Sequence, residues 1–210
     1  MSAEVRYSYD AMADLYASLN LDALDGDSNA REWLAVFAKL AARRHGVVAD
    51  LGCGPGHVVH HLSELDLNVI GFDLSKGQIA QARRAFPEAE FHVGDLAALD
   101  VTDSSIGGIV SRYSIIHIAP SLLSDVFGEW IRVLEPEAPV LVSFFGSLSA
   151  DTHGAPFDHK VATAYELSPG TIARQLQDAG FVDIEIGVCP TPDGVRPFDQ
   201  ATVLAIKPGI

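Results

Sequence analysis

The 210-residue chain has few cysteines, few positive charges and no long hydrophobic run. Its two cysteines, Cys53 and Cys189, lie far apart, which fits a reducing compartment better than a disulfide framework. No apolar run approaches the roughly 18 residues of a membrane-spanning helix, and residues 1–4 show no basic or apolar leader. We therefore expect a cytoplasmic protein with no membrane partner.

Positive charge is scarce because 14 Lys and Arg stand against 28 Asp and Glu, which gives a formal net charge of −14. Proteins that bind nucleic acid cluster Lys and Arg, and the nearest such group here is Arg43-Arg44 beside His45. The acidic balance thus argues against a partner such as nucleic acid or an anionic membrane. At 48% hydrophobic residues, the chain can fold as one structural domain without a disulfide or a structural metal.

Short β-branched runs alternate with helical periodicity from residue 46 onward, which predicts an α/β fold with a mostly parallel sheet. Strands are expected at 47–51, 68–73, 90–95, 106–112 and 139–146, with helices at 57–65, after Ser75 and at about 120–134. A further helix follows Ser168 and ends at Gly180, and the runs at 181–188 and 201–207 predict an antiparallel C-terminal β-hairpin. These runs together give a seven-stranded sheet.

The two segments outside this alternation have different characters. Residues 1–45 predict an N-terminal helical cap on the main region, which is expected at 46–210. Residues 147–167 are polar and lack a sustained period, so we expect an insertion or loop near the functional site.

A glycine loop at Gly52, Gly54 and Gly56 joins the first strand to a helix. Such a loop lets the backbone approach a ligand closely and presents the amides of a helix N-terminus. Asp73 lies 23 residues after Asp50 and ends the next strand, where a carboxylate can accept hydrogen bonds from ribose hydroxyls. The pattern favours a nucleoside ligand.

Two departures separate this loop from a dinucleotide fingerprint. Position 57 is His where the fingerprint has its third glycine. Asp50 and Asp95 would repel a pyrophosphate, but they suit a ligand with an ammonium, ribose hydroxyls and an adenine amine. S-adenosylmethionine carries all three groups, and a nicotinamide-dependent oxidoreductase is the weaker interpretation.

Over most of its length the chain resembles the class I S-adenosylmethionine-dependent methyltransferases, especially the small-molecule, menaquinone-biosynthesis-like branch. The stretch from Val47 to Gly56 is similar to the first motif of that family, Gly71 to Ser75 to the second, and Gly94 to Leu96 to the third. The resemblance implies a Rossmann-like sheet with helices on both faces, S-adenosylmethionine as cofactor, and methyltransferase activity.

The resemblance also implies roles for individual residues. The glycine loop would follow the methionine portion of the cofactor, Asp73 would hold the ribose, and Asp95 with Leu96 would contact adenine. The implied cofactor-binding residues are Asp50, Gly52, Cys53, Gly54, Gly56, Asp73, Leu74, Gly94, Asp95, Leu96, Arg112 and Tyr16. Where the family has Pro-Gly-Gly, this chain has Pro136-Glu137-Ala138, so a left-handed turn is not expected there.

Residues 112–117 follow the fourth strand, where the acceptor of the methyl group is expected. Methyl transfer requires alignment, exclusion of water and, for a protonated acceptor, removal of a proton. His117 suits that base because a histidine has an ordinary pKa of about 6.5, although a packing histidine bonded to a backbone carbonyl is an equal alternative. We expect His117 and Tyr113 to be catalytic and Tyr9, Tyr113 and His117 to bind substrate, whereas Arg112 lines the pocket or lies on the surface.

Two further patterns narrow the function. Ser111 to Ser114 replace the Asn/Asp-Pro-Pro-aromatic motif of nucleic-acid amino-methyltransferases. His57, His60 and His61 have helix-face spacing but no matching carboxylate or cysteine, so no metal site is expected. We expect methyl transfer to O or N of a small molecule by in-line displacement, and a quinone-like phenol, a carboxylate and an amine all fit. The alternative is a cofactor-binding protein that is non-catalytic or uses the cofactor in a non-methylating reaction.

Overall fold

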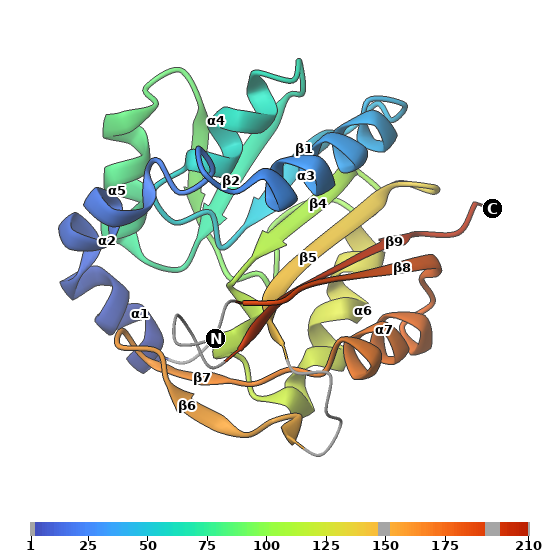
Figure 1. Cartoon of the computed structure of the whole chain (residues 1–210). Helices are drawn as coiled ribbons and strands as arrows, with labels where there is room; N and C mark the ends of the chain where they lie inside the picture. Colours follow the sequence, from blue (N-terminus) through green and yellow to red (C-terminus); the bar gives the residue numbers. More distant parts are fainter. Residues whose placement is uncertain (1–2, 147–151, 192–197, 210) are drawn as a thin grey trace.

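A seven-stranded sheet forms the centre of the computed structural model, which describes residues 3–146, 152–191 and 198–209. Its strand order is β3-β2-β1-β4-β5-β9-β8 (Figure 1). The parallel strands are β1 (Val47–Leu51), β2 (Val69–Asp73), β3 (Glu90–Val93), β4 (Ile106–Arg112) and β5 (Pro139–Gly146). Strand β9 (Asp199–Ile206) runs antiparallel to β5, and β8 (Val182–Cys189) runs antiparallel to β9. The fold predicted from the sequence is confirmed.

Helices cover both faces of the sheet (Figure 1). One face carries α3 (Ser28–Ala41), α4 (His57–Ser63) and α5 (Lys76–Ala85), and the other carries α6 (Leu123–Val133) and α7 (Pro169–Asp178). Each face has its own buried apolar cluster, centred on Phe37 and Phe91 in the first and on Phe127 and Trp130 in the second. Strand β5 is buried throughout, as a central strand covered on both faces must be.

Helices α1 (Ala3–Ala11) and α2 (Ala13–Asn20) lie against α5. Asp10 anchors them, because its Oδ1 accepts hydrogen bonds from Ser75 Oγ at 2.6 Å and from Gly77 N at 2.9 Å. A Cβ on Gly77 would lie 2.9 Å from the Cβ of Ala13, so the close approach needs glycine there. Within the expected cap, α1 and α2 therefore cover the start of α5, whereas α3 packs on the face of the sheet.

The polar insertion contains a two-stranded sheet of β6 (Pro156–Asp158) and β7 (Thr163–Tyr165), at the lower edge of Figure 1. Each strand has three residues, which is too short to show a period of two in the sequence. Strand β7 contacts the short helix η1 (Ile115–His117), which follows β4. Residues 147–151 of the insertion lie outside the described part of the chain.

The turn before β5 corrects one prediction. Glu137 has a φ of 61°, so the left-handed turn forms without glycine. Three contacts hold it: Glu137 N donates to Lys207 O at 2.9 Å, and Arg44 pairs with the Glu137 carboxylate at 2.8 Å and reaches Pro136 O at 3.2 Å. These tertiary contacts offset the cost of about 1 to 2 kcal/mol that a side chain has in this conformation.

Candidate active site

The candidate site lies at the carboxyl ends of β1 and β4, where the strand order reverses direction. Gly52 and Gly54 follow β1 with φ values of 81° and 52°, which glycine adopts without strain. A Cβ on Gly52 would lie 2.3 Å from the Cβ of Ser114, so the loop presses against the residues that follow β4. Ser114 also donates through Oγ to Leu51 O at 2.9 Å. Ser114 was not named among the predicted site residues, although it falls within residues 112–117, where the acceptor was expected.

Asp73 joins the end of β2 to both neighbouring loops. Its Oδ2 accepts from Gly54 N at 3.0 Å and its Oδ1 accepts from Ser75 N at 2.8 Å. Burial raises the pKa of Asp73 to about 6, although the hydrogen bonds from the Ser75 and Gly54 amides act in the opposite direction. A carboxylate has about four acceptor positions, so Asp73 keeps capacity for ligand hydroxyls.

Asp50 is a buried carboxyl group that the protein does not fully satisfy. Only 1% of the residue is exposed, and within the described part of the chain its Oδ2 has no hydrogen-bond partner. Burial raises the pKa of Asp50 to about 7; nearby Arg112 lowers it and Asp73 raises it further. Arg112 itself pairs with Asp27 at 3.3 Å. A buried acceptor of this kind suits a cationic or hydrogen-bond-donating ligand group.

Two adjoining cavities open at this end of the sheet. The narrow one, of about 50 Å³, is lined by Tyr9, Tyr16, Gly52, Gly54, Asp73, Leu74, Gly94, Asp95, Leu96, Arg112, Tyr113, Ser114 and His117. The larger one, of about 730 Å³, shares Tyr16, Gly52, Gly54, Arg112 and Tyr113 with it. The structure thus brings together residues from the cap, the glycine loop and the ends of four strands.

Three predicted cofactor residues do not line the narrow cavity. Asp50 and Cys53 line the larger cavity, and Gly56 lines neither. A Cβ on Gly56 would lie 2.7 Å from the Phe91 ring, so this glycine allows close packing between the loop and β3. Burial raises the pKa of the Cys53 thiol well above its ordinary value, which fits a packing residue and not a nucleophile.

His117 connects three parts of the chain that are distant in sequence. Its Nδ1 lies 2.9 Å from Thr163 O and its Nε2 lies 2.8 Å from the hydroxyl of Tyr9. Because a carbonyl oxygen only accepts, Nδ1 carries the proton, and Nε2 accepts from Tyr9. Burial lowers the pKa of His117, which keeps the imidazole neutral near pH 7. One ring nitrogen therefore binds a backbone carbonyl, as a packing histidine would, and the other contacts Tyr9 in the cavity; the role of His117 as a base stays a prediction.

Tyr9 is the partner of His117. Burial, followed by the charges of Tyr16 and Asp73, raises the pKa of Tyr9 above its ordinary value, so the phenol stays protonated and donates to His117. The hydroxyl of Tyr113, which was predicted to act with His117, donates to Gln200 Oε1 at 2.7 Å.

Tyr113 has an unusual backbone conformation. Its φ is 54°, a value that is rare for a bulky residue, and such conformations cluster at functional sites. The Tyr113 N–H donates to Ser143 O at 2.7 Å, and the ring lies 4.7 Å from that of Phe145. These contacts fix the ring as a wall between the two cavities.

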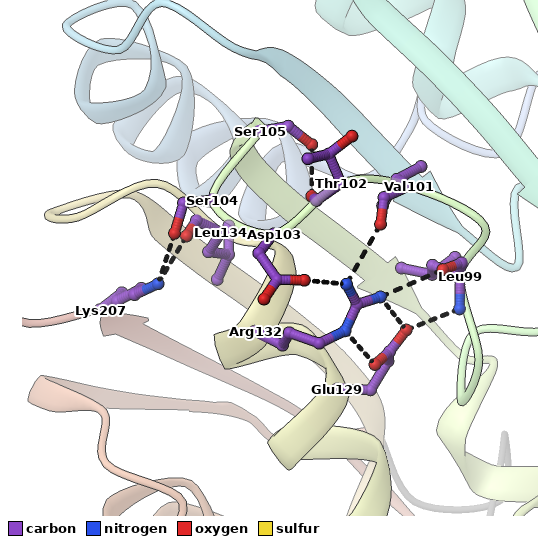
Figure 2. A network of polar contacts seen from close by, with 10 residues as sticks. All are labelled: Leu99, Val101, Thr102, Asp103, Ser104, Ser105, Glu129, Arg132, Leu134 and Lys207. Atoms are coloured by element: carbon purple, nitrogen blue, oxygen red, sulfur yellow. Dashed lines mark hydrogen bonds and ion pairs between the residues drawn. The ribbon is translucent and has the colours of Figure 1, made fainter.

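Helix α6 holds the loop that runs from Leu99 to Ser105 ahead of β4 (Figure 2). Arg132 pairs with Glu129 at 2.7 Å and Asp103 at 2.5 Å, and it donates to the carbonyls of Leu99 and Val101. Glu129 in turn accepts from Leu99 N at 2.7 Å. Beside this network, Trp130 Nε1 donates to Leu96 O at 2.9 Å. The edge of the narrow cavity at Leu96 is therefore held by α6, which packs in the same apolar cluster as Leu96.

Two other features are absent from the described ranges. No group of three or more His, Cys, Asp or Glu side chains in residues 3–146, 152–191 and 198–209 is placed to hold a metal ion. In the same ranges, no helix combines the length and the apolar character that crossing a membrane requires.

Comparison with known proteins gives a consistent picture. A profile described as a methyltransferase domain matches residues 48–137. A "probable S-adenosylmethionine-dependent methyltransferase" of Mycolicibacterium smegmatis is 30% identical over 73% of this chain and 59% of its own. Phosphoethanolamine N-methyltransferase 1 of Arabidopsis thaliana is 34% identical over 65% of this chain and 29% of its own. The chain thus spans only part of the length of these relatives.

A solved structure extends the likeness to almost the whole fold. Burkholderia thailandensis 1,6-didemethyltoxoflavin-N1-methyltransferase, with bound 1,6-didemethyltoxoflavin and S-adenosylhomocysteine, superposes with a TM-score of 0.71 at 20% identity. The match covers 99% of this chain and 92% of that one. At this identity the likeness concerns the fold.

Proposed function

The chain belongs to the class I S-adenosylmethionine-dependent methyltransferases, and from this premise we propose that it methylates an oxygen or nitrogen of a small-molecule acceptor. The family and its cofactor, both predicted from the sequence, are confirmed. The small-molecule acceptor, the menaquinone-like branch and a cytoplasmic location are parts of the proposal. The observation that carries it is the neutral His117 with Tyr9, placed in one cavity with the glycine loop and Asp73.

The donor set of the site fits S-adenosylmethionine. Asp50, with an unsatisfied buried oxygen, suits the ammonium group, and Asp73 suits the ribose hydroxyls. A Cβ on Gly52 would clash with Ser114, and a side chain at Gly54 would be strained by the positive φ, so glycine keeps the backbone of this loop accessible. Asp95 and Leu96 form the edge of the cavity that is proposed to contact adenine. The cofactor supplies an electrophilic methyl group. The narrow cavity is about 50 Å³, so its walls open to admit the cofactor in this proposal, and Tyr9 and Tyr16 are the cap residues among them.

The proposed mechanism uses the chain to align the acceptor, exclude water and remove a proton. The Nε2 lone pair of His117 is the proton acceptor. An acceptor hydroxyl or amine bound beside Tyr9 passes its proton to the phenol oxygen while Tyr9 passes its own to Nε2. Thr163 O then stabilises the imidazolium through the Nδ1 proton. General-base assistance of this kind contributes about 100-fold to 10,000-fold in rate.

Titration calorimetry with S-adenosylhomocysteine tests the cofactor part of the proposal, and no binding at millimolar ligand would refute it. Incubation with S-adenosylmethionine and a metabolite extract, followed by mass spectrometry, tests turnover. Appearance of S-adenosylhomocysteine would exclude the alternative of a protein that binds the cofactor without spending it.

Substitution tests the base. We expect His117→Asn and Tyr9→Phe each to slow turnover at least about 100-fold, with cofactor affinity changed only a few-fold. The matched control is His92→Asn, because His92 is half-exposed and pairs with Glu90 at 2.6 Å, outside both cavities. Unchanged turnover of His117→Asn across pH would remove His117 from the mechanism.

A further inference from the structure

The larger cavity extends from the transfer point toward α2 and the β6–β7 hairpin. Its volume of about 730 Å³ lies within the range of about 300 to 1,000 Å³ that is typical of small-molecule sites. It shares Tyr16 and Tyr113 with the narrow cavity, so a molecule bound in it can reach the cofactor's methyl group. The chemistry of its walls therefore indicates the class of acceptor.

One wall is apolar although it faces water. Leu15 and Leu19 are 54% and 71% exposed, both line the cavity, and they lie one turn apart on the same face of α2. Met12 lines the cavity just before them. A ligand that covers these side chains must itself present an apolar surface.

The larger cavity is also lined by the rings of Tyr16, Tyr113, Phe145 and His159, and those of Tyr9 and His117 line the narrow cavity beside it. A continuous series of ring contacts, with centroid separations from 4.7 to 5.7 Å, runs in the order Tyr16, Tyr9, His117, His159, Phe145 and Tyr113. The series begins in the cap, crosses η1 and the insertion hairpin, and ends after β4. Rings spaced in this way favour a flat aromatic partner, which can pack face or edge against several of them.

The cationic side chains of the cavity are already paired. Arg112 contacts Asp27 at 3.3 Å, and Lys160 contacts Asp158 at 2.6 Å. A phosphate or carboxylate on the acceptor would therefore face cations that carboxylates already neutralise, which is unfavourable.

From these three observations we propose that the acceptor is an uncharged, planar aromatic molecule with a hydroxyl group. The inference rests on the proposed methyltransferase function and names its substrate class. In the reaction the aromatic O–H loses its proton through Tyr9 to His117, the O–CH3 bond forms, and the S–CH3 bond breaks. The products are the aryl methyl ether, S-adenosylhomocysteine and one proton, which His117 returns to solvent.

Three matched probes test the class: 2-naphthol, its saturated counterpart decahydro-2-naphthol, and 2-naphthyl phosphate. With S-adenosylhomocysteine present, calorimetry should show 2-naphthol binding at least about tenfold more tightly than the other two. With S-adenosylmethionine, 2-naphthol should yield 2-methoxynaphthalene. Equal binding of the saturated alcohol, tighter binding of the phosphate, or tighter binding of phosphoethanolamine than of 2-naphthol would overturn the proposal.

A variant pair tests the place of binding. Leu19→Asp puts a charge on the apolar wall and should weaken 2-naphthol at least about tenfold while S-adenosylhomocysteine binds as before. Leu122→Asp is the matched control, because Leu122 is 53% exposed and lines neither cavity. Equal effects of the two variants would refute the assigned wall. If wild-type protein binds S-adenosylhomocysteine but not 2-naphthol, only the acceptor class falls; if it binds neither, the proposed function falls as well.

Discussion

Cofactor binding should release protons near neutral pH, because the buried Asp50 carboxyl is partly protonated in the free protein. Burial raises the pKa of Asp50 to about 7, so close to half of the molecules carry this proton at pH 7. A cationic group within about 4 to 6 Å lowers a carboxyl pKa by about 1 to 3. The ammonium group of the cofactor should therefore expel the Asp50 proton as it binds.

The size of the effect follows from linkage. If the ammonium lowers the Asp50 pKa by about 2, binding releases about 0.5 proton at pH 7 and about 0.8 proton at pH 6. The dissociation constant is then about fivefold weaker at pH 6 than at pH 7. In this window the ligand's own amino group, with an ordinary pKa of about 7.7 to 8.0, stays largely protonated. Asp73, whose pKa is raised to about 6, adds to the release at the lower pH.

Calorimetry with S-adenosylhomocysteine in phosphate and in Tris measures the released protons, because the two buffers differ in ionisation enthalpy. Asp50→Asn should remove most of the release at pH 7 and leave only the contribution of Asp73 below it. Asp178→Asn is the control, since Asp178 is exposed at the end of α7. Absence of proton release in the wild type, or the same release from Asp50→Asn, would refute the assignment of Asp50 to the ammonium group.

Three further outcomes are expected from single substitutions. The folded-state pKa of Asp50 lies above its unfolded value of about 3.9, so its ionisation costs stability as pH rises from about 4 to 7. Asp50→Asn should therefore raise the free energy of unfolding by about 1 to 4 kcal/mol at pH 8, with a smaller gain at pH 5; denaturant melts that show a loss at pH 8 would contradict this. Arg132→Met should weaken S-adenosylhomocysteine binding several-fold by loosening the loop of Leu96, whereas Arg174→Met, which removes only an exposed contact with Thr171 at 3.2 Å, should not. Glu137→Gly should change the unfolding free energy by less than about 1 kcal/mol, because relief of the left-handed conformation offsets loss of the ion pair with Arg44. A larger loss of stability in thermal melts would show that the ion pair dominates.

The sheet and the cofactor loop could be predicted from the sequence because local signals determine them. Short, mostly apolar runs such as Val47 to Leu51 favour a buried strand, and a glycine loop followed by Asp73 predicts a ligand at the end of that strand. The positive φ values of Gly52 and Gly54 agree with that pattern. Each of these features depends on residues within about one βα unit.

The features that sequence analysis missed depend on tertiary contacts. The contact between Tyr9 and His117 joins residues 108 positions apart and depends on where α1 packs. Its two residues were named separately as substrate-binding, but no local pattern pairs them. The left-handed turn at Glu137 forms because Arg44 and Lys207 meet it from distant segments, which outweighs the local preference for glycine.

The position of α1 links the cofactor site to the base. Ser75 donates its backbone N–H to Asp73 and its hydroxyl to Asp10. This one residue therefore contacts both the carboxylate that is proposed to bind ribose and the helix of the cap. Tyr9 is the neighbour of Asp10 on α1 and carries the contact to His117. A movement of α1 that enlarges the narrow cavity for the cofactor therefore also separates Tyr9 from His117. Tyr9 and His117 are already paired in this structure, so the proposed proton transfer requires α1 to return to this position over the bound cofactor, where it also excludes water.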